Sequence, residues 1–364
     1  MKWELSQQLI SWHKIHKEKG LYGRYITIEM IEPILMGLTL PFTVVKVGKS
    51  FQKKPIYKIS VGSGDLKILI WSQMHGNETT GTKAVFDMFK YLSSNETITK
   101  QILKECTLVF IPMLNPDGAS AYTRVNAQEI DLNRDAVALK AEESRLLQGI
   151  LKEVEPKFCF NLHDQRTIFS VGKQNLPATM SFLAPSVDES RTETDGRKVT
   201  MSVIVAINNV LQEHVPNQIG RYTDEFYPTA TGDNFEKLGY HTILMESGHF
   251  KDDYQREKVR CFTFLALVSS IYVVSNRVIT IDYNSYFNIP NNKKQYLDII
   301  YKNVLLPDRK KRIDIGILFK EQLIDGKIIF KQTIDKQGDL SSYNANSYID
   351  LIDKKMILAD LLKN

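Results

Sequence analysis

The fold is decided in residues 66–81, which read LKILIWSQMHGNETTG. An apolar run from Ile68 to Trp71 leads into a polar loop, and a helical pattern begins near Thr79. The run has the length and composition of a buried strand. Because α/β sheets build their sites where a strand ends in a loop, this stretch predicts an α/β fold with candidate functional residues in that loop.

The same alternation of apolar runs and amphipathic patterns extends on both sides of this stretch. Short apolar runs predict strands at residues 44–47, 56–61, 67–72, 107–114, 157–162 and 241–246. Amphipathic patterns predict helices at about residues 79–92, 141–154, 196–214 and 255–274. Strands that alternate with helices imply a largely parallel or mixed sheet with helices on both faces.

Three segments are expected along the chain. Residues 1–40 mix a helical pattern with a short β-like run at Tyr25–Ile28 and are predicted to form a helical or irregular extension. Residues 41–282 hold the alternating strands and helices and are predicted to form the main domain. Beyond Asp282 the composition shifts toward Asn, Lys, Asp and Tyr, and short strands are expected at 313–319, 326–332 and 348–352. Residues 283–364 are therefore predicted to form a small β-rich domain, in which we find no chemical motif.

The composition excludes several classes of protein. The 364 residues include 47 Lys and Arg against 42 Asp and Glu, with 43% hydrophobic and 24% charged residues. These values are globular, which excludes collagen-like, disordered and disulfide-framework proteins. The net charge of +5 is weak and is spread among acidic neighbours, so it predicts no nucleic-acid partner.

The sequence predicts neither a membrane span nor a secretory signal. The longest uncharged run, Cys261–Asn276, is shorter than the roughly 20 residues that cross a bilayer, so it predicts a buried helix. Glu4, His13 and Lys14 precede any long apolar run, which is not the pattern of a secretory signal. The expected location is therefore the cytoplasm.

Three residues offer the ligands of a metal site. His75 and Glu78 lie three apart in the loop after the quoted strand, where Gly76 lets the backbone bend and bring both side chains to one side. His163 ends the strand predicted at 157–162 and supplies a third donor. Each residue alone is also typical of a surface turn or a structural histidine. Together they match a common catalytic zinc site, in which two His and one Glu leave a position for water.

Other polar residues suit the binding and conversion of a carboxylate-bearing substrate. Asn133 and Arg134 together offer a guanidinium fork and an amide donor for a carboxylate, and Arg124 could face an oxyanion. Taken separately, each Arg is also typical of a solvated surface residue. Glu246 ends an apolar strand, where it would be a general base beside a metal-bound water, or otherwise a partner in an ion pair at the edge of the core.

The ordered set of motifs resembles the zinc carboxypeptidase family of metallopeptidases. His-x-x-Glu, Asn-Pro-Asp-Gly at 115–118, an Arg, Asn-Arg, a strand-terminal His and a strand-terminal Glu follow one another between residues 75 and 246. The resemblance implies a mixed, twisted, roughly eight-stranded sheet between helices. It also implies one Zn²⁺ ion bound by His75, Glu78 and His163.

The resemblance assigns further roles. It implies that Arg124 polarises the scissile carbonyl, that Asn133 and Arg134 bind the terminal carboxylate of the substrate, and that Glu246 is the general base and proton shuttle. A mobile Tyr of the family corresponds best to Tyr227, with Tyr222 as a rival. Asp233 falls where the family contacts the last side chain of the substrate, so it would favour Lys, Arg or diaminopimelate, although Asp and Gly also simply make turns.

The predicted activity is zinc-dependent hydrolysis of the C-terminal amide bond of a peptide with a free carboxylate. The spellings His-Gly-Asn-Glu-Thr and Asp-Leu-Asn-Arg also resemble the succinylglutamate desuccinylases and aspartoacylases, which act on N-acyl amino acids. Asn-Pro-Asp-Gly favours the peptidases. A non-catalytic binder of peptide termini, or a scaffold subunit that docks a partner through the C-terminal segment, are alternatives of other classes. The substrate and the oligomeric state stay open.

Overall fold

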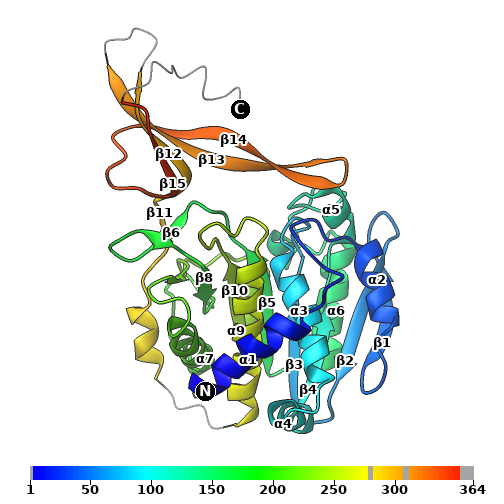
Figure 1. The fold of residues 1–364 in the computed structure, drawn as a ribbon. Helices are drawn as coiled ribbons and strands as arrows, with labels where there is room; N and C mark the ends of the chain where they lie inside the picture. Colours follow the sequence, from blue (N-terminus) through cyan, green and yellow to red (C-terminus); the bar gives the residue numbers. More distant parts are fainter. Residues whose placement is uncertain (1–2, 278–281, 306–310, 353–364) are drawn as a thin grey trace.

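An eight-stranded mixed sheet forms the centre of the protein (Figure 1). The computed structural model describes residues 3–277, 282–305 and 311–352. The strand order is β1-β2-β4-β3-β5-β10-β8-β9. These strands are β1 Thr43–Lys49, β2 Pro55–Val61, β3 Leu66–Trp71, β4 Cys106–Ile111, β5 Phe158–Asp164, β8 Met180–Leu183, β9 Ile219–Arg221 and β10 His241–Ser247. The mixed, roughly eight-stranded sheet expected from the sequence is thus confirmed.

The four central strands are parallel, and helices cover both faces of the sheet. Neighbours in the order β4-β3-β5-β10 pair in parallel, so their carboxyl ends share one edge. Ile68 and Ile70 of β3 belong to one buried cluster, and Leu69 and Trp71 belong to the cluster on the opposite face. Because successive side chains of a strand point to opposite faces, a strand covered on both sides reads as a continuous apolar run.

The helices form two layers around the sheet. One layer contains α3 Thr80–Leu92, α7 Asp195–Gln212 and α9 Glu257–Ser275, whose buried residues share the larger cluster. The other contains α6 Glu142–Val154 and α8 Thr231–Lys237. Shorter helices are α4 Thr97–Glu105 and α5 Pro116–Ala121. The four predicted helices are all present, with ends within two residues or so of the expected ones.

Helix α9 is a core helix. Its 19 residues are long and apolar enough to cross a membrane by length and composition, but 72% of its most apolar window is buried inside the protein. It packs against α1 Trp3–His16, α3, α4 and α7. The uncharged run Cys261–Asn276 therefore forms the buried helix that the sequence predicted.

The first 40 residues pack on the main core. Helix α1 and helix α2 Ile28–Met36 bury Leu9, Ile31 and Leu35 in the larger cluster. The β-like run predicted at Tyr25–Ile28 is wrong, because this segment is a loop that leads into α2. Ile26 and Ile28 are buried by packing and not by strand pairing, which explains why an apolar alternation misled the prediction.

A second sheet of four strands follows near the C-terminus, in the order β14-β13-β12-β15. Its strands are β12 Tyr296–Leu305, β13 Arg312–Ile324, β14 Lys327–Gly338 and β15 Asn344–Asp350. Strands β13 and β14 form a long hairpin that runs above the central sheet toward α5 (Figure 1). The strands predicted at 313–319 and 326–332 are shorter than β13 and β14, because the remaining parts of both strands include charged residues that interrupt the apolar pattern. The strand predicted at 348–352 overlaps only the end of β15, which begins at Asn344. Strand β12 was not predicted.

A small sheet and a short helix connect the two large sheets. Strand β11 Lys293–Lys294 pairs with β6 Phe169–Val171, which pairs with β7 Leu176–Pro177. The 3-10 helix η2 Tyr283–Asn288 packs against α7, and its Tyr286 is fully buried in the larger cluster. The chain therefore contacts the main core before it enters the C-terminal sheet.

Candidate metal centre and active site

The three predicted metal ligands meet at the carboxyl edge of the central sheet. His75 lies in the loop after β3, Glu78 lies just before α3, and His163 lies in β5. His75 Nδ1 is 2.9 Å from Glu78 Oε1, and His163 Nδ1 is 2.8 Å from Glu78 Oε2. One ligand atom from each residue lies within 4.8 Å of the others. The arrangement is a candidate site for one metal ion.

Strand register explains why residues far apart in sequence meet here. In the parallel pair of β10 and β5, Glu246 is directly opposite His163. In the parallel pair of β3 and β5, Trp71 is opposite Asn161, so the loop that carries His75 starts beside the end of β5. Parallel strands in register place their terminal side chains on one edge, and the candidate base therefore lies beside a candidate ligand.

The Asn-Pro-Asp-Gly motif positions the loop of His75 and does not itself line the cavity. Asn115 accepts a hydrogen bond from Gly118 N (2.8 Å) at the start of α5 and donates to Met74 O (3.1 Å). Gly76 packs directly on Gly118, since a Cβ at residue 76 would lie only 1.9 Å from the Gly118 carbonyl carbon. Both glycines allow this close backbone contact.

The chemistry of the donors fits a cation. His75 Nε2 is 3.0 Å from Asp131 Oδ1, which fixes the ring with Nε2–H toward Asp131 and the Nδ1 lone pair toward the other ligands. His75 Nδ1 then lies 3.1 Å from His163 Nδ1, in a group that also contains the Glu78 carboxylate. Lone pairs and carboxylate oxygens that converge in this way are stabilised by a positive ion, and two imidazoles with one carboxylate suit zinc.

The charge and burial of the candidate ligands also fit the binding of a cation. Burial opposes ionisation of Glu78, but the neighbouring imidazoles of His75 and His163 hold the pKa of that carboxyl far below its usual value. Asp131 is likewise desolvated, yet its contact with His75 lowers its pKa. Asp131 was not assigned a role from the sequence. The sequence feature that could have indicated Asp131 is its place in Asp-Leu-Asn-Arg, two residues before Asn133 and Arg134, the predicted carboxylate clamp.

Glu246 faces the cavity without a polar partner. Among the residues that the structure describes, its carboxyl group makes no hydrogen bond or ion pair, which does not support the alternative prediction of an ion-pair partner. Burial raises the pKa of Glu246 well above its usual value, and the negative charges of Glu78 and Asp164 add to this effect. A carboxyl group poised to hold a proton beside the ligands can transfer that proton.

Arg124 bridges the candidate ligands and their support. Its Nε donates to Asp131 Oδ2 (2.9 Å), and its Nη1 is 3.4 Å from Glu78 Oε1. The side chain is 46% exposed, so it is neither a core residue nor fully solvated. It can therefore turn donors toward an oxygen of a bound substrate.

Asn133 and Arg134 are presented by a short 3-10 helix, η1 Leu132–Arg134. Asn133 Oδ1 accepts from Thr231 N (3.2 Å), which leaves its amide NH₂ without a partner among the described residues. The Arg134 guanidinium lies 5.2 Å from the ring centre of Tyr227. Both residues line the cavity that contains the candidate ligands.

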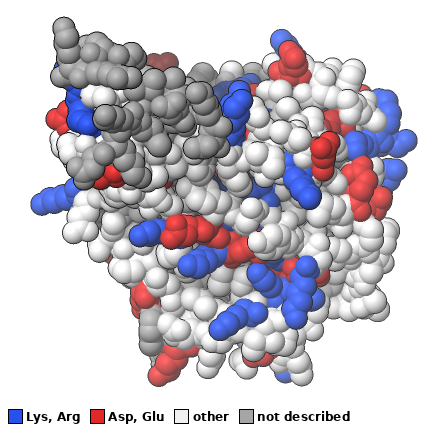
Figure 2. Space-filling view, turned by 45° about the horizontal axis from the view of Figure 1, so that its top comes forward, with Lys and Arg blue, Asp and Glu red and all other residues white. Residues whose placement is uncertain are grey.

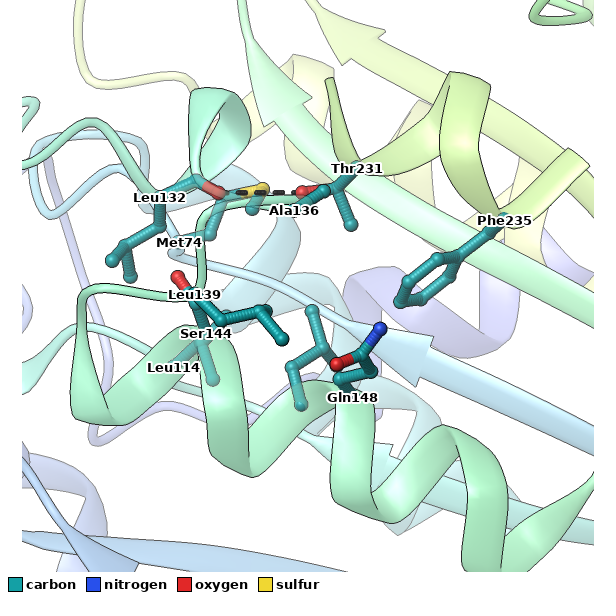
Figure 3. A pocket seen from close by; sticks show the side chains of 10 residues that line it. Met74, Leu114, Leu132, Ala136, Leu139, Ser144, Gln148, Thr231 and Phe235 are labelled. Atoms are coloured by element: carbon teal, nitrogen blue, oxygen red, sulfur yellow. Dashed lines mark hydrogen bonds between the residues drawn. The ribbon is translucent and has the colours of Figure 1, made fainter. Parts of the chain in front are cut away.

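A small apolar cavity lies behind this turn (Figure 3). Its volume is about 10 Å³, and the Thr231 hydroxyl donates to Leu132 O (3.3 Å) beside it. Since a cavity needs roughly 10–15 Å³ to hold one water, no ligand site is present there. The apolar lining instead supports η1 from behind, by way of Met74, Leu114, Leu132, Ala136, Leu139, Leu147 and Phe235.

Both candidate tyrosines line the main cavity, so the choice between them stays a prediction. Tyr222 is near Glu246 and packs on Phe169, with 5.2 Å between ring centres. Tyr227 is 43% exposed, and its backbone N–H donates to Asp233 Oδ1 (3.0 Å). Burial raises the pKa of Asp233 to about 6. Asp233 therefore holds the Tyr227 loop and faces the cavity at the same time.

The main cavity has a volume of about 870 Å³ and includes residues that the sequence did not indicate. Arg24 comes from the loop before α2, Asp164 follows the ligand His163, and Glu321 comes from β13 of the C-terminal sheet. Arg24 Nη1 is 3.0 Å from Glu321 Oε1. No local sequence pattern could have indicated these residues, because only tertiary contacts bring them to the cleft.

Charges are mixed on the outer surface near this region. In Figure 2, Lys and Arg lie next to Asp and Glu, and no field of one sign covers the described part of this face.

Comparisons with known proteins identify a similar family. A zinc carboxypeptidase family model matches residues 41–145, a range that contains His75, Glu78, Arg124, Asn133 and Arg134. Carboxypeptidase 2 of Trichophyton tonsurans is 24% identical over 128 residues, which are 35% of this chain and 23% of that protein. Carboxypeptidase SOL1 of Arabidopsis thaliana is 29% identical over 124 residues, which are 30% of this chain and 25% of that protein. The chain thus matches about a quarter of the length of these curated relatives.

A solved structure extends the comparison to the fold. A metallo-carboxypeptidase from Burkholderia cenocepacia aligns with a TM-score of 0.56 and 18% sequence identity, over 70% of each chain. The fold is therefore that of the metallocarboxypeptidases. Together with the family match, this confirms the resemblance to the zinc carboxypeptidase family that the motifs indicated.

Proposed function

We propose that this protein is a zinc-dependent carboxypeptidase that hydrolyses the C-terminal amide bond of a peptide with a free carboxylate. One observation carries the proposal. His75, Glu78 and His163 converge within 4.8 Å, and the cavity that they line also contains Glu246 and the Asn133–Arg134 pair. The family match over residues 41–145 supports the same activity.

The ligands and the base would divide the chemistry between them. A zinc ion bound by His75, Glu78 and His163 supplies a Lewis acid and lowers the pKa of water from about 15.7 toward about 7. Glu246 takes the proton of the attacking water and later delivers it to the leaving amine. Asp131 holds the His75 ring in the orientation that directs Nδ1 toward the ligand group.

The remaining residues orient the substrate. Arg124 donates to the carbonyl oxygen as negative charge develops on it, a contribution of about 3–4 kcal/mol for one well-placed donor. Asn133 and Arg134 bind the terminal carboxylate, which restricts cleavage to chain ends. Tyr227, or its rival Tyr222, would close over the bound substrate, and Asp233 would favour an amino-bearing last side chain.

Two alternatives are less well supported. A deacylase of N-acyl amino acids is not favoured, because the matching family model and the similar proteins described above are carboxypeptidases. A non-catalytic binder of peptide termini has no use for the unpaired Glu246 beside the ligands. Both alternatives make distinct predictions in the same assay.

The test combines metal analysis with a substrate screen. We expect one zinc per chain, and release of the last residue from peptides whose C-terminal residue is varied. Peptides with an amidated C-terminus are the matched controls and should not be cleaved. Zinc content without cleavage of any carboxylate-terminated amide would contradict catalysis. Cleavage of N-acetyl or N-succinyl amino acids alone would establish the deacylase instead.

A further inference from the structure

The C-terminal sheet contributes to the same cavity as the candidate catalytic residues. Leu318, Phe319, Lys320 and Glu321 of β13 line it opposite the carboxyl edge of the central sheet. The hairpin of β13 and β14 runs above that edge (Figure 1). The cavity is therefore bounded by two sheets.

Strand β13 is held at two points beside the cavity. Toward the hairpin turn, Glu321 pairs with Arg24 (3.0 Å) and accepts a hydrogen bond from the Tyr122 hydroxyl. Toward the base, Phe319 N donates to Asp298 Oδ2 (2.7 Å), and the Phe319 ring lies 5.2 Å from Tyr254. A strand fixed at two points acts as a wall and not as a free flap.

Outside its own sheet this wall contacts Arg24, Tyr122 and Tyr254, none of which belongs to the carboxylate clamp. Arg134, Tyr227 and Asp233 are joined by direct contacts and form the part of the cavity that would receive the last residue of the substrate. Arg24, which Glu321 contacts, lies near Asp164. The wall therefore borders the cavity beside Asp164, the residue after the ligand His163, and this is a part of the cavity that the clamp leaves for the upstream residues of a substrate.

The upstream part presents buried polar atoms that lack partners. Arg24 is 7% exposed and Asp164 is 9% exposed. Among the described residues, Arg24 Nε and Asp164 Oδ1 have no hydrogen-bond partner, and both side chains line the cavity. Buried polar groups are normally satisfied, so this surface is suited to bind a polar group and not merely to pack two domains together.

We propose that β13 forms the upstream wall of the substrate site and restricts the enzyme to short peptides. This inference rests on the proposed carboxypeptidase function. The cavity of about 870 Å³ lies within the roughly 300–1,000 Å³ typical of sites that enclose small ligands.

The test is a ladder of peptides in which only the upstream length varies. Each peptide ends in Ala followed by the residue that the wild-type enzyme releases fastest, with zero to five further Ala residues in front. We expect kcat/KM of the wild-type enzyme to fall at least about tenfold between the short and the long members, because the long ones collide with the wall. Equal values across the ladder would overturn the proposal.

A variant with a shortened hairpin tests whether β13 is the wall that limits peptide length. Replacing residues 319–332 with Asn-Gly joins two residues that are paired in the hairpin, Leu318 and Thr333, by a tight turn and removes Glu321. The ratio of kcat/KM between short and long peptides should approach one. The matched control replaces residues 324–327 with Asn-Gly, which shortens the hairpin but keeps Glu321, and should retain the wild-type ratio. If the folded 319–332 variant keeps the wild-type ratio of kcat/KM between short and long peptides, β13 is not the wall. If that variant does not fold, equal kcat/KM values along the wild-type ladder would still overturn the proposal.

Measurements of peptide binding test the wall independently of the proposed carboxypeptidase activity. The Glu246→Gln variant is titrated with the same peptides by calorimetry after loading with zinc. Tighter binding of the short peptides without turnover by the wild-type enzyme would contradict the carboxypeptidase and support the wall. Equal Kd values along the ladder would contradict the wall, even if every peptide is cleaved by the wild-type enzyme.

Discussion

The two sheets that border the cavity are built differently. In β5 of the central sheet all seven residues are buried, and the side chains of β3 divide between two large core clusters. In β14 of the C-terminal sheet no residue is fully buried, and the cores of that sheet contain five and four buried residues. The central sheet thus has the larger buried core, and the C-terminal sheet has a hairpin that extends beyond its own small core.

This difference matches the roles that we propose for the two sheets. Catalytic groups must be held within a fraction of an ångström, which favours residues on or beside buried strands. His163 and Glu246 satisfy this condition, because they lie opposite each other in a fully paired strand register. A thin hairpin is sufficient for a wall that selects substrates by length, because the wall must block space but need not hold its atoms in an exact geometry.

The largest expected effect concerns the chemistry of the central sheet. Glu246→Gln keeps the shape of the side chain but removes the base, so we expect kcat to fall about 10²- to 10⁴-fold. Zinc content should not change. Glu321→Gln on β13 is the comparison, and it should alter KM more than kcat. Full activity of the Glu246 variant in a steady-state assay would remove that residue from the mechanism.

Packing of the central sheet gives the next largest effect. Phe160 of β5 is fully buried in the larger core cluster. Phe160→Ala should lower the free energy of unfolding by about 3–5 kcal/mol, since it removes a large apolar side chain and leaves a cavity. Urea unfolding followed by circular dichroism measures the change. A loss below about 1 kcal/mol, the range of surface substitutions, would contradict the packing described here.

A buried carboxyl in the central domain should make stability depend on pH. Glu236 of α8 is 4% exposed and accepts a hydrogen bond from Thr242 N (2.6 Å), and burial raises its pKa to about 7 from the model-compound value of 4.5. Between pH 4.5 and 7 the folded state binds more protons than the unfolded state, so stability falls as the pH rises.

Glu236→Gln removes this titration and keeps a hydrogen-bond acceptor. We expect the variant to be stabilised relative to the wild-type protein by about 3 kcal/mol more at pH 8 than at pH 4.5. Unfolding free energies measured at both pH values test this. The same difference between the two proteins at both pH values would mean that Glu236 ionises in the folded state as easily as in the unfolded chain.

The support of the metal site should have a moderate effect. Asp131→Asn removes the negative charge beside His75 Nε2, and zinc affinity should fall about 10- to 100-fold, because such partners orient the ligand and raise its basicity. Competition with a zinc-binding dye measures the affinity. Asp135→Asn is a nearby control, since Asp135 accepts hydrogen bonds from Lys140 and Ala141 and contacts none of the ligands. Equal affinities of the two variants would speak against the role of Asp131.

The smallest effect is expected in the C-terminal sheet. Ile317 of β13 is fully buried in the five-residue cluster. Ile317→Val removes one methylene and should cost about 0.5–1.5 kcal/mol. The change in thermal midpoint, set beside that of Phe160→Ala, shows whether the two sheets unfold together. Two separate transitions, with only one shifted by each substitution, would show that they do not.

The central fold could be predicted because buried parallel strands leave a strong local signal. The predicted runs at 56–61 and 241–246 coincide with β2 and β10 to within one residue at each end. The weaker predictions concern segments whose burial does not follow strand periodicity, such as Tyr25–Ile28, or whose strands are exposed, such as β14. Local patterns report on burial, and they report on strand pairing only when the two coincide.

The candidate site was predicted in part for the same reason. His75, Glu78, His163 and Glu246 stand at or just after the ends of apolar strands, and this position is visible in the sequence. The contacts of Asp131 with His75 and of Arg24 with Glu321 join residues 56 and 297 positions apart. No local pattern encodes such pairs.

The amino-acid sequence by itself therefore indicated six of the eight strands of the central sheet, all but the short β8 and β9, together with the candidate ligands and base, because burial and strand ends are local properties. The tertiary structure alone decided that Glu246 lies opposite His163, that Asp131 contacts His75, and that β13 lines the cavity. These features depend on strand order and on the docking of a distant sheet. Both arise from contacts between residues far apart along the chain.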